Sequence, residues 1–108
     1  HSPLMTPARE ALAESLDSLE ISDSLYPVFT NVDAKPVTQG NDIKDSLIRQ
    51  LENPVLWAKS ILSMKESGIE SFVEVGPGKV LQGLNKRIDR KTRSQGVETL
   101  EQVERFNV

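Results

Sequence analysis

One residue of this sequence is suited to carrying protons near neutral pH, and it stands at the first position. His1 is the only histidine among the 108 residues. Its imidazole, with an ordinary pKa of about 6.5, can accept a proton from a nucleophile and later return it. A terminal histidine can equally be the remnant of an affinity tag, so the residue alone leaves both interpretations open.

The other side chains that attack substrates form no recognisable group. The sequence has no cysteine, which excludes a thiolate nucleophile, a disulfide and a cysteine zinc site. No serine occurs in G-x-S-x-G, the turn that exposes a serine nucleophile in many α/β enzymes. The carboxylates are scattered along the chain. We therefore expect neither the nucleophile nor a metal site within these residues.

The stretch EVGPGKVLQGL (74–84) has the order of a strand, a glycine turn and a helix. Free N–H groups at a helix start attract phosphate or carboxylate, so one interpretation is an anion site. The spacing matches neither the P-loop pattern nor G-x-G-x-x-G. The alternative, which we favour, is a tight connection that needs its glycines for backbone reasons.

A basic segment, NKRIDRKTR (85–93), follows this helix. It could receive an acidic partner protein. The favoured alternative is a solvated helix end, where cations interact well with the helix dipole. The cations are Lys86, Arg87, Arg90, Lys91 and Arg93.

The composition is that of a soluble globular chain long enough for one domain at most. Its formal net charge of −3 argues against general nucleic-acid binding. No stretch approaches the roughly 20 apolar residues of a membrane span. The absence of cysteine suits a reducing cytoplasm, where we expect the protein to work.

Helix signals open the chain. Ser2 and Pro3 predict an N-cap and first helical residue, and Thr6–Pro7 repeats the signal one turn later. A strand that is short or at the edge of a sheet is expected at 25–32, because Pro27 limits its pairing. The apolar stripe of the first helix is Ala8, Leu12, Leu16 and Leu19.

Two more helices are expected in the middle of the chain. A loop over 33–42 leads to the first of them, capped by Asn41 or Asp42. Asn53–Pro54 is expected to start the second at once, and Gly68 to stop it. Their apolar faces are Ile43, Leu47, Ile48 and Leu51, and then Val55, Trp57, Ala58, Ile61 and Leu62.

The last third begins with a strand at 71–75 and a helix at 79–88, in which Gly83 could mark close packing. A polar linker is predicted for 89–96, and Thr99 with Gln102 predicts a capping box for a final short helix. Two short strands do not make a stable sheet. We therefore expect the missing strands to lie outside these residues, in a larger α/β domain of which this chain is the C-terminal piece.

Four motifs resemble one enzyme family in the same order. HSPLM (1–5) before a capped helix resembles the catalytic-histidine segment of the malonyl-CoA:acyl-carrier-protein transacylases of bacterial fatty-acid synthesis. PVFTNVDAKPVT (27–38), LIRQLENPVLWAKSI (47–61) and FVEVGPGKVLQGLNKRID (72–89) continue the resemblance. It covers residues 1–90 as a family-like core, and leaves 91–108 as a tail with a short helix.

The resemblance implies the C-terminal part of an α/β-hydrolase-like large subdomain, without the upstream strands and the ferredoxin-like insertion. It also implies that the nucleophilic serine and the malonyl-binding arginine belong to upstream segments. His1 is then the general base of a ping-pong malonyl transfer through a malonyl-serine intermediate. By motif position, the main-chain carbonyl of Gln50 orients its imidazole. We expect this chain alone to be inactive.

The implied substrate is malonyl-CoA, with no cofactor and no metal. The implied partners are acyl carrier protein and the N-terminal part of the same enzyme, with no nucleic acid or membrane, and the full enzyme is expected to be a monomer. Two alternatives stay open. One is the acyltransferase domain of a polyketide synthase, and the other is a small helical binding module without catalysis, docking through residues 86–93.

Overall fold

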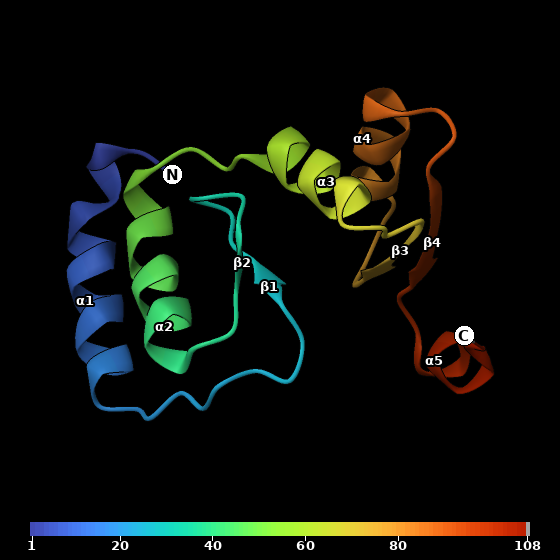
Figure 1. The fold of residues 1–108 in the computed structure, drawn as a ribbon. Helices are drawn as coiled ribbons and strands as arrows, with labels where there is room; N and C mark the ends of the chain where they lie inside the picture. The colour runs from blue at the N-terminus through green and yellow to red at the C-terminus, as the bar shows by residue number, and fades with distance from the viewer. Residues whose placement is uncertain (108) are drawn as a thin grey trace. The chain divides into compact units, whose positions relative to one another are not determined.

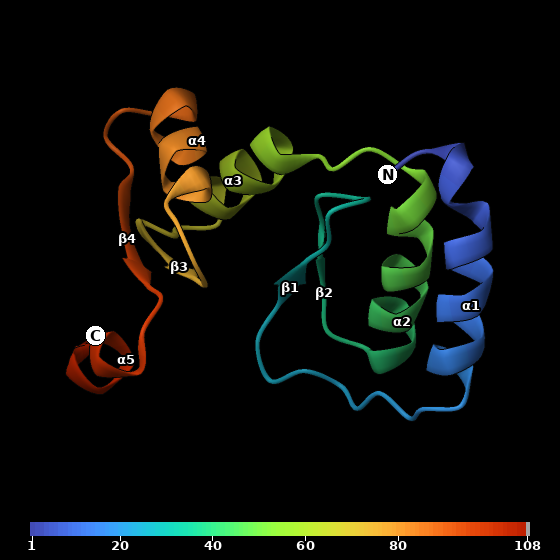
Figure 2. The same ribbon diagram turned by 180° about the vertical axis from the view of Figure 1, so that it is seen from behind.

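The computed structural model of the chain describes residues 1–107, and Figures 1 and 2 show its fold from opposite sides. The chain divides into two compact units, His1–Ser63 and Met64–Val108, which are described separately. Helices and short strands alternate in both units, and the predicted α/β class is confirmed.

Two neighbouring helices form most of the first unit. A 3₁₀ helix, η1 (Pro3–Met5), leads into α1 (Thr6–Asp17), and α2 (Gly40–Arg49) continues into a second 3₁₀ helix, η2 (Gln50–Glu52). Helices α1 and α2 lie side by side (Figure 1). The predicted cap is confirmed, because the Ser2 hydroxyl accepts a hydrogen bond from the Leu4 N–H.

The predicted stripe of α1 is only partly buried. Leu12 and Leu16 are half-buried, whereas Ala8 and Leu19 are exposed. Leu19 lies beyond the end of the helix at Asp17, so helical spacing no longer applies to it.

The strands of the first unit form a short hairpin. Strands β1 (Val28–Phe29) and β2 (Pro36–Val37) are antiparallel, with Val28 opposite Val37. The predicted strand at 25–32 is therefore confirmed only at its centre. The prediction of a loop over the whole of 33–42 was wrong, since it contains β2 and the start of α2.

The start of α2 was assigned to the wrong residue. Gln39, and not Asn41 or Asp42, occupies the N-cap position. Tertiary contacts explain the shift. The Gly40 N–H donates to the Asp23 carboxylate at 2.8 Å, and a Cβ on Gly40 would lie 1.7 Å from the carbonyl oxygen of Ile21. A capping group from a distant segment thus replaces the local one.

The prediction that Asn53–Pro54 starts a helix was also wrong. Helix α3 (Trp57–Glu66) begins later, and Asn53 has extended backbone angles. The Leu56 N–H donates to the Asn31 carbonyl at 2.9 Å, which holds this stretch away from helical geometry. Gly68 follows the helix with a φ of +97°, as expected of a glycine stop.

The second unit is built around a parallel strand pair. Strand β3 (Ser71–Val75) pairs with β4 (Arg93–Val97), and α4 (Val80–Ile88) connects them. The polar linker predicted for 89–96 was therefore wrong over its second half. The sequence RSQGV has little intrinsic strand preference, so its pairing with β3 decides its conformation. Helix α5 (Leu100–Arg105) has the predicted capping box, with both arms present.

Few apolar side chains are fully buried. The buried hydrophobic residues of 1–107 are Ala34, Ile61 and Val97, whereas Leu4 is 89% and Leu25 92% exposed. Strand β4 covers one edge of β3. Parallel sheets are normally covered on both faces.

Within the described part of the chain, no helix is long and apolar enough to cross a membrane.

The chain by itself should unfold without a sharp transition. Because many apolar side chains are already exposed in the folded chain, little buried apolar surface remains to be exposed in one cooperative step on heating. We expect circular dichroism of the isolated 108 residues to show a gradual loss of helix, with binding of a hydrophobic dye before heating. A single steep melting transition without dye binding would contradict this expectation and favour an independent binding module.

Candidate active site

The N-terminal segment that carries His1 lies against the turn that carries Gln50. The Ser2 N–H donates to the Leu51 carbonyl at 3.0 Å. The Thr6 hydroxyl donates to the Glu52 carboxylate at 2.9 Å, and Arg9 forms an ion pair with the same carboxylate at 2.7 Å. These contacts join two parts of the sequence that are far apart. The two candidate residues, His1 and Gln50, directly precede the two residues of the Ser2–Leu51 hydrogen bond.

The proposed partner atom of the histidine is the Gln50 carbonyl oxygen. It accepts a hydrogen bond from the Asn53 N–H at 3.4 Å, which is at the long end of the range. A carbonyl oxygen has two lone pairs, so a second donor can be accommodated. His1 is exposed, and the hydrogen bonds within residues 1–107 include none between it and Gln50. Their pairing stays a prediction.

The side chain of Gln50 is held by a residue that the sequence did not single out. The Asn31 amide donates to Gln50 Oε1 at 3.1 Å, and both residues are half-buried. The Asn31 carbonyl also accepts the Leu56 N–H at 2.9 Å. Asn31 follows β1 in the stretch FTNVD (29–33), and no local signal separates it from an ordinary turn asparagine.

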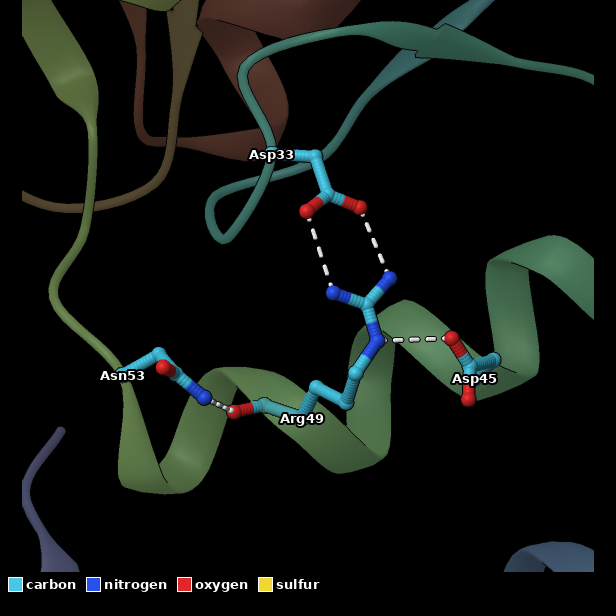
Figure 3. A network of polar contacts seen from close by, with 4 residues as sticks. All are labelled: Asp33, Asp45, Arg49 and Asn53. Atoms are coloured by element: carbon cyan, nitrogen blue, oxygen red, sulfur yellow. Dashed lines mark hydrogen bonds and ion pairs between the residues drawn. The ribbon is translucent and has the colours of Figure 1, made fainter.

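An arginine beside Gln50 forms a charged network (Figure 3). The Arg49 guanidinium donates two hydrogen bonds to Asp33, at 2.7 and 3.0 Å, and one to Asp45 at 2.6 Å. The Asn53 amide donates to the Arg49 carbonyl at 2.8 Å. Two parallel hydrogen bonds fix direction as well as distance, so the loop after β1 is tied firmly to the end of α2.

This network changes the acidity of its members. The hydrogen bonds from Arg49 hold the pKa of the Asp33 carboxyl group below its ordinary value. The hydrogen bonds to Asp33 and then Asp45 raise the pKa of the Arg49 guanidinium above its already high value. Both groups therefore keep their charges at neutral pH.

A small pocket lies between β1 and α2, beside this network. It has a volume of about 190 Å³, and Asn31 and Gln50 contribute to its wall. Thr30 lines it as well, and its hydroxyl is buried without a hydrogen-bond partner in the described structure. The pocket belongs to the first unit only.

The glycine turn after β3 is not available to an external anion. Gly76 and Gly78 have φ angles of +132° and +82°, which favours the interpretation that the turn needs glycine for its backbone. The Glu74 carboxylate accepts hydrogen bonds from the N–H groups of Leu81 and Gln82 at 3.3 and 3.2 Å. A carboxylate of the chain itself thus occupies the first turn of α4. Gly83 has open space around it, so close packing does not explain that glycine.

The cations of the basic segment are exposed, at the end of α4 and just after it. Its one acid, Asp89, forms an ion pair with Lys65 and accepts a hydrogen bond from the Lys91 N–H, which together lower its pKa. The ion pairs within residues 1–107 include none formed by the four exposed side chains that we call the basic cluster, which are Lys86, Arg87, Arg90 and Lys91. In the same range, no three His, Cys, Asp or Glu side chains gather as a metal site.

Comparison with known sequences gives a consistent result. The chain is 44% identical over 104 residues to the malonyl CoA-acyl carrier protein transacylase of Bacillus subtilis, covering 96% of this chain and 33% of the relative. It is 50% identical over 88 residues to the Escherichia coli K12 enzyme, covering 82% of this chain and 28% of the relative. The chain thus spans about a third of the length of these relatives. No family model matches it.

Solved structures agree with the sequences. An acyl carrier protein S-malonyltransferase from Vibrio cholerae superposes with a TM-score of 0.87 at 41% identity, over 96% of this chain and 34% of that one. A malonyl-transacylase in complex with a type II polyketide acyl-carrier protein gives a TM-score of 0.83 at 39% identity, over 95% and 34% of the two chains.

The ion pair beside Gln50 should make stability depend on pH. The test protein is the Bacillus subtilis enzyme with its matching segment replaced by this chain, called the chimera below. Because the pKa of Asp33 is lowered on folding, its contribution is present above the unfolded pKa of about 3.9 and is lost as the pH falls through the folded value. We expect Asp33→Asn to lower the urea midpoint at pH 7 by an amount equivalent to at most about 1 kcal/mol.

At about pH 3 the difference between this variant and the unmutated chimera should be smaller, because Asp33 binds its proton more readily in the unfolded chain, where its pKa is about 3.9, than in the folded chain, where the pKa is lower. Asp45→Asn is the matched control. Asp45 bonds the same arginine with a single contact and is more exposed, at 64% against 36%, so a smaller loss is expected. An equal loss for Asp33→Asn at both pH values would show that its charge is not the cause.

Four motifs in order, the contact of the His1 and Gln50 segments, and the matches in sequence and fold all agree. The resemblance seen in the motifs is confirmed: this chain is related in sequence and structure to the malonyl CoA-acyl carrier protein transacylases and corresponds to about a third of their length.

Proposed function

We propose that this chain is part of a malonyl-CoA:acyl-carrier-protein transacylase and supplies its general base, His1. The observation that carries the proposal is the contact between the His1 and Gln50 segments, through the Ser2–Leu51 hydrogen bond, in a chain that is 44% identical to a transacylase. The nucleophilic serine and the arginine that binds malonyl are proposed to come from the remainder of the same enzyme.

The proposed reaction has two acyl transfers. His1 accepts the proton of the serine hydroxyl, the serine oxygen attacks the thioester carbonyl of malonyl-CoA, and the carbon–sulfur bond breaks to release coenzyme A, which takes the proton. The thiol of the carrier protein's phosphopantetheine then gives its proton to His1 and attacks the malonyl-serine ester. The serine leaves and recovers the proton. The reaction as written needs no cofactor.

Gln50 is proposed to orient the base through its main chain. If the imidazole donates its Nδ1–H to the Gln50 carbonyl, Nε2 is left without a proton and can face the serine. A neutral carbonyl fixes this tautomer but stabilises the imidazolium less than a carboxylate does. The long Asn53 hydrogen bond, and the lack of an N–H on Pro54, support a carbonyl with room for this second donor.

The proposed protein partner is acyl carrier protein, which is acidic in this family. The side chains of the basic cluster are exposed and form no ion pair within the described residues, which supports a docking role. We propose that the complete enzyme works in the cytoplasm as a monomer. The neighbour solved with a polyketide acyl-carrier protein supports carriers of polyketide synthesis as an alternative destination of the malonyl group.

The first test is activity of the chimera. We expect the chimera to transfer malonyl groups to acyl carrier protein and the chain alone to transfer none, because the nucleophile is not in it. His1→Ala should lower kcat by about a hundred- to ten-thousand-fold, the usual effect of losing a general base. Gln50→Ala keeps the main-chain carbonyl and should cost about tenfold or less.

The assay is carrier-protein malonylation followed by mass spectrometry. Ser15→Ala, an exposed substitution on α1, is a control that should leave the rate unchanged. A fully active His1→Ala chimera would exclude His1 as the base. Malonyl transfer by the isolated chain would refute the assignment of the nucleophile to another segment.

The second test concerns the basic cluster. Reversing two charges, Lys86→Glu with Arg87→Glu, should raise the Michaelis constant for acyl carrier protein and leave that for malonyl-CoA unchanged. Surface charges of this kind mainly raise association rates, and salt screens them. The Michaelis constants for acyl carrier protein of the charge-reversed and unmutated chimeras should therefore become similar as the salt concentration rises. Equal Michaelis constants for acyl carrier protein in the two chimeras at low salt would show that the cluster is only a solvated helix end.

A further inference from the structure

Three consecutive residues around the proposed carbonyl are each tied to a different segment of the first unit. Arg49 is bound through its guanidinium to Asp33. The side chain of Gln50 accepts from Asn31, and the main chain of Leu51 accepts from Ser2. Of these ties, only the one from Asn31 acts on Gln50 itself.

Asn31 makes two contacts that lie on either side of the turn. Its side chain reaches Gln50 Oε1 at 3.1 Å, and its carbonyl accepts the Leu56 N–H at 2.9 Å. The first contact limits rotation of the Gln50 side chain, and the second fixes the extended stretch that follows η2. The two ion-pair hydrogen bonds between Asp33 and Arg49 in turn hold the loop that carries Asn31.

We propose that Asn31 is a positioning residue for catalysis, which acts through the side chain of Gln50 to hold its main-chain carbonyl toward the base. The inference rests on the proposed function, because it needs His1 to be that base. Asn31 touches neither the substrate nor His1 in this scheme. It sets the orientation of Gln50, and Gln50 sets the orientation of the imidazole.

The position of the pair supports an orienting role. Both side chains are half-buried and border the same pocket, where a neutral hydrogen bond competes less with water than it would at the surface. Orientation matters for rate, since small misplacements of a reacting group are costly. Because the groups are neutral, their effect should fall on kcat and not on recognition of the charged substrate.

A double-mutant cycle in the chimera tests the proposal. The four proteins are the unmutated chimera, Asn31→Ala, Gln50→Ala and the double variant. We expect Asn31→Ala to lower kcat about tenfold, with the Michaelis constant for malonyl-CoA changed by less than about twofold. In the Gln50→Ala background, the same substitution should change kcat by less than about twofold, because the side chain through which it acts is gone.

Two controls separate positioning from a loss of folding. Asn41→Ala removes an exposed asparagine of α2 and should leave kcat unchanged. Circular dichroism and the urea midpoint should show that all four proteins of the cycle are folded under assay conditions. The Leu56 N–H bonds to the main-chain carbonyl of Asn31, which Asn31→Ala retains, so the substitution tests the side chain alone. A merely structural role of that side chain would lower kcat by the same factor in both backgrounds.

The outcomes distinguish this inference from the proposed function. An active chimera in which Asn31→Ala has no effect, or has an equal effect with and without the Gln50 side chain, would overturn the positioning role alone. A folded but inactive unmutated chimera would overturn the proposed function and the inference with it. A tenfold loss that disappears in the Gln50→Ala background would establish Asn31 as a positioning residue.

Discussion

The bidentate ion pair between Arg49 and Asp33 is the interaction on which the candidate site depends. Pairs as exposed as this one contribute little to global stability, so its importance lies in geometry. Two parallel hydrogen bonds define the orientation of the loop after β1 relative to the end of α2. That loop carries Asn31, and the helix end carries Gln50. The ion pair therefore holds Asn31 and the candidate carbonyl of Gln50 in place relative to each other.

A carbonyl can orient an imidazole only if it keeps a free lone pair in a fixed direction. The end of a helix supplies such carbonyls, because the last ones have no partner within the helix. Here α2 continues into η2 and then into an extended stretch, and the Gln50 oxygen accepts a long hydrogen bond from the Asn53 N–H. Neighbouring carbonyls are already in use, since Arg49 accepts from Asn53 and Leu51 from Ser2.

The sequence predicted those features of the fold that are encoded locally. The Ser2 cap, the Thr99–Gln102 capping box, the Gly68 stop and the strand at 71–75 are each determined by residues a few positions apart. The wrong predictions have the opposite cause, which is contact between segments distant in sequence. Asp23 caps α2 from a distant segment, the Asn31 carbonyl delays α3, and pairing with β3 makes a strand of a polar stretch. Asn31 itself was missed because its importance comes entirely from a contact distant in sequence.

The candidate site followed from motifs rather than from chemistry visible in these residues alone. A lone histidine and a glutamine carbonyl cannot be recognised from residue types and their spacing, because every residue type has a main-chain carbonyl. The resemblance placed both, and the fold brings their segments together through the Ser2–Leu51 hydrogen bond. The large exposed apolar side chains have a matching explanation. The relatives are about three times longer than this chain, and we propose that segments corresponding to their remaining two thirds cover these side chains.

The Glu74 carboxylate at the start of α4 means that this strand–turn–helix unit carries its own counter-ion. Glycine turns that bind nucleotides depend on a phosphate to neutralise the helix start, so selection for the ligand constrains their sequence. Here the neutralising charge is covalently attached and always present. The turn can therefore diverge wherever its positive φ angles are kept. Loss of the carboxylate by substitution would leave the first N–H groups of the helix open, which is one route by which a structural connection could evolve into a phosphate site.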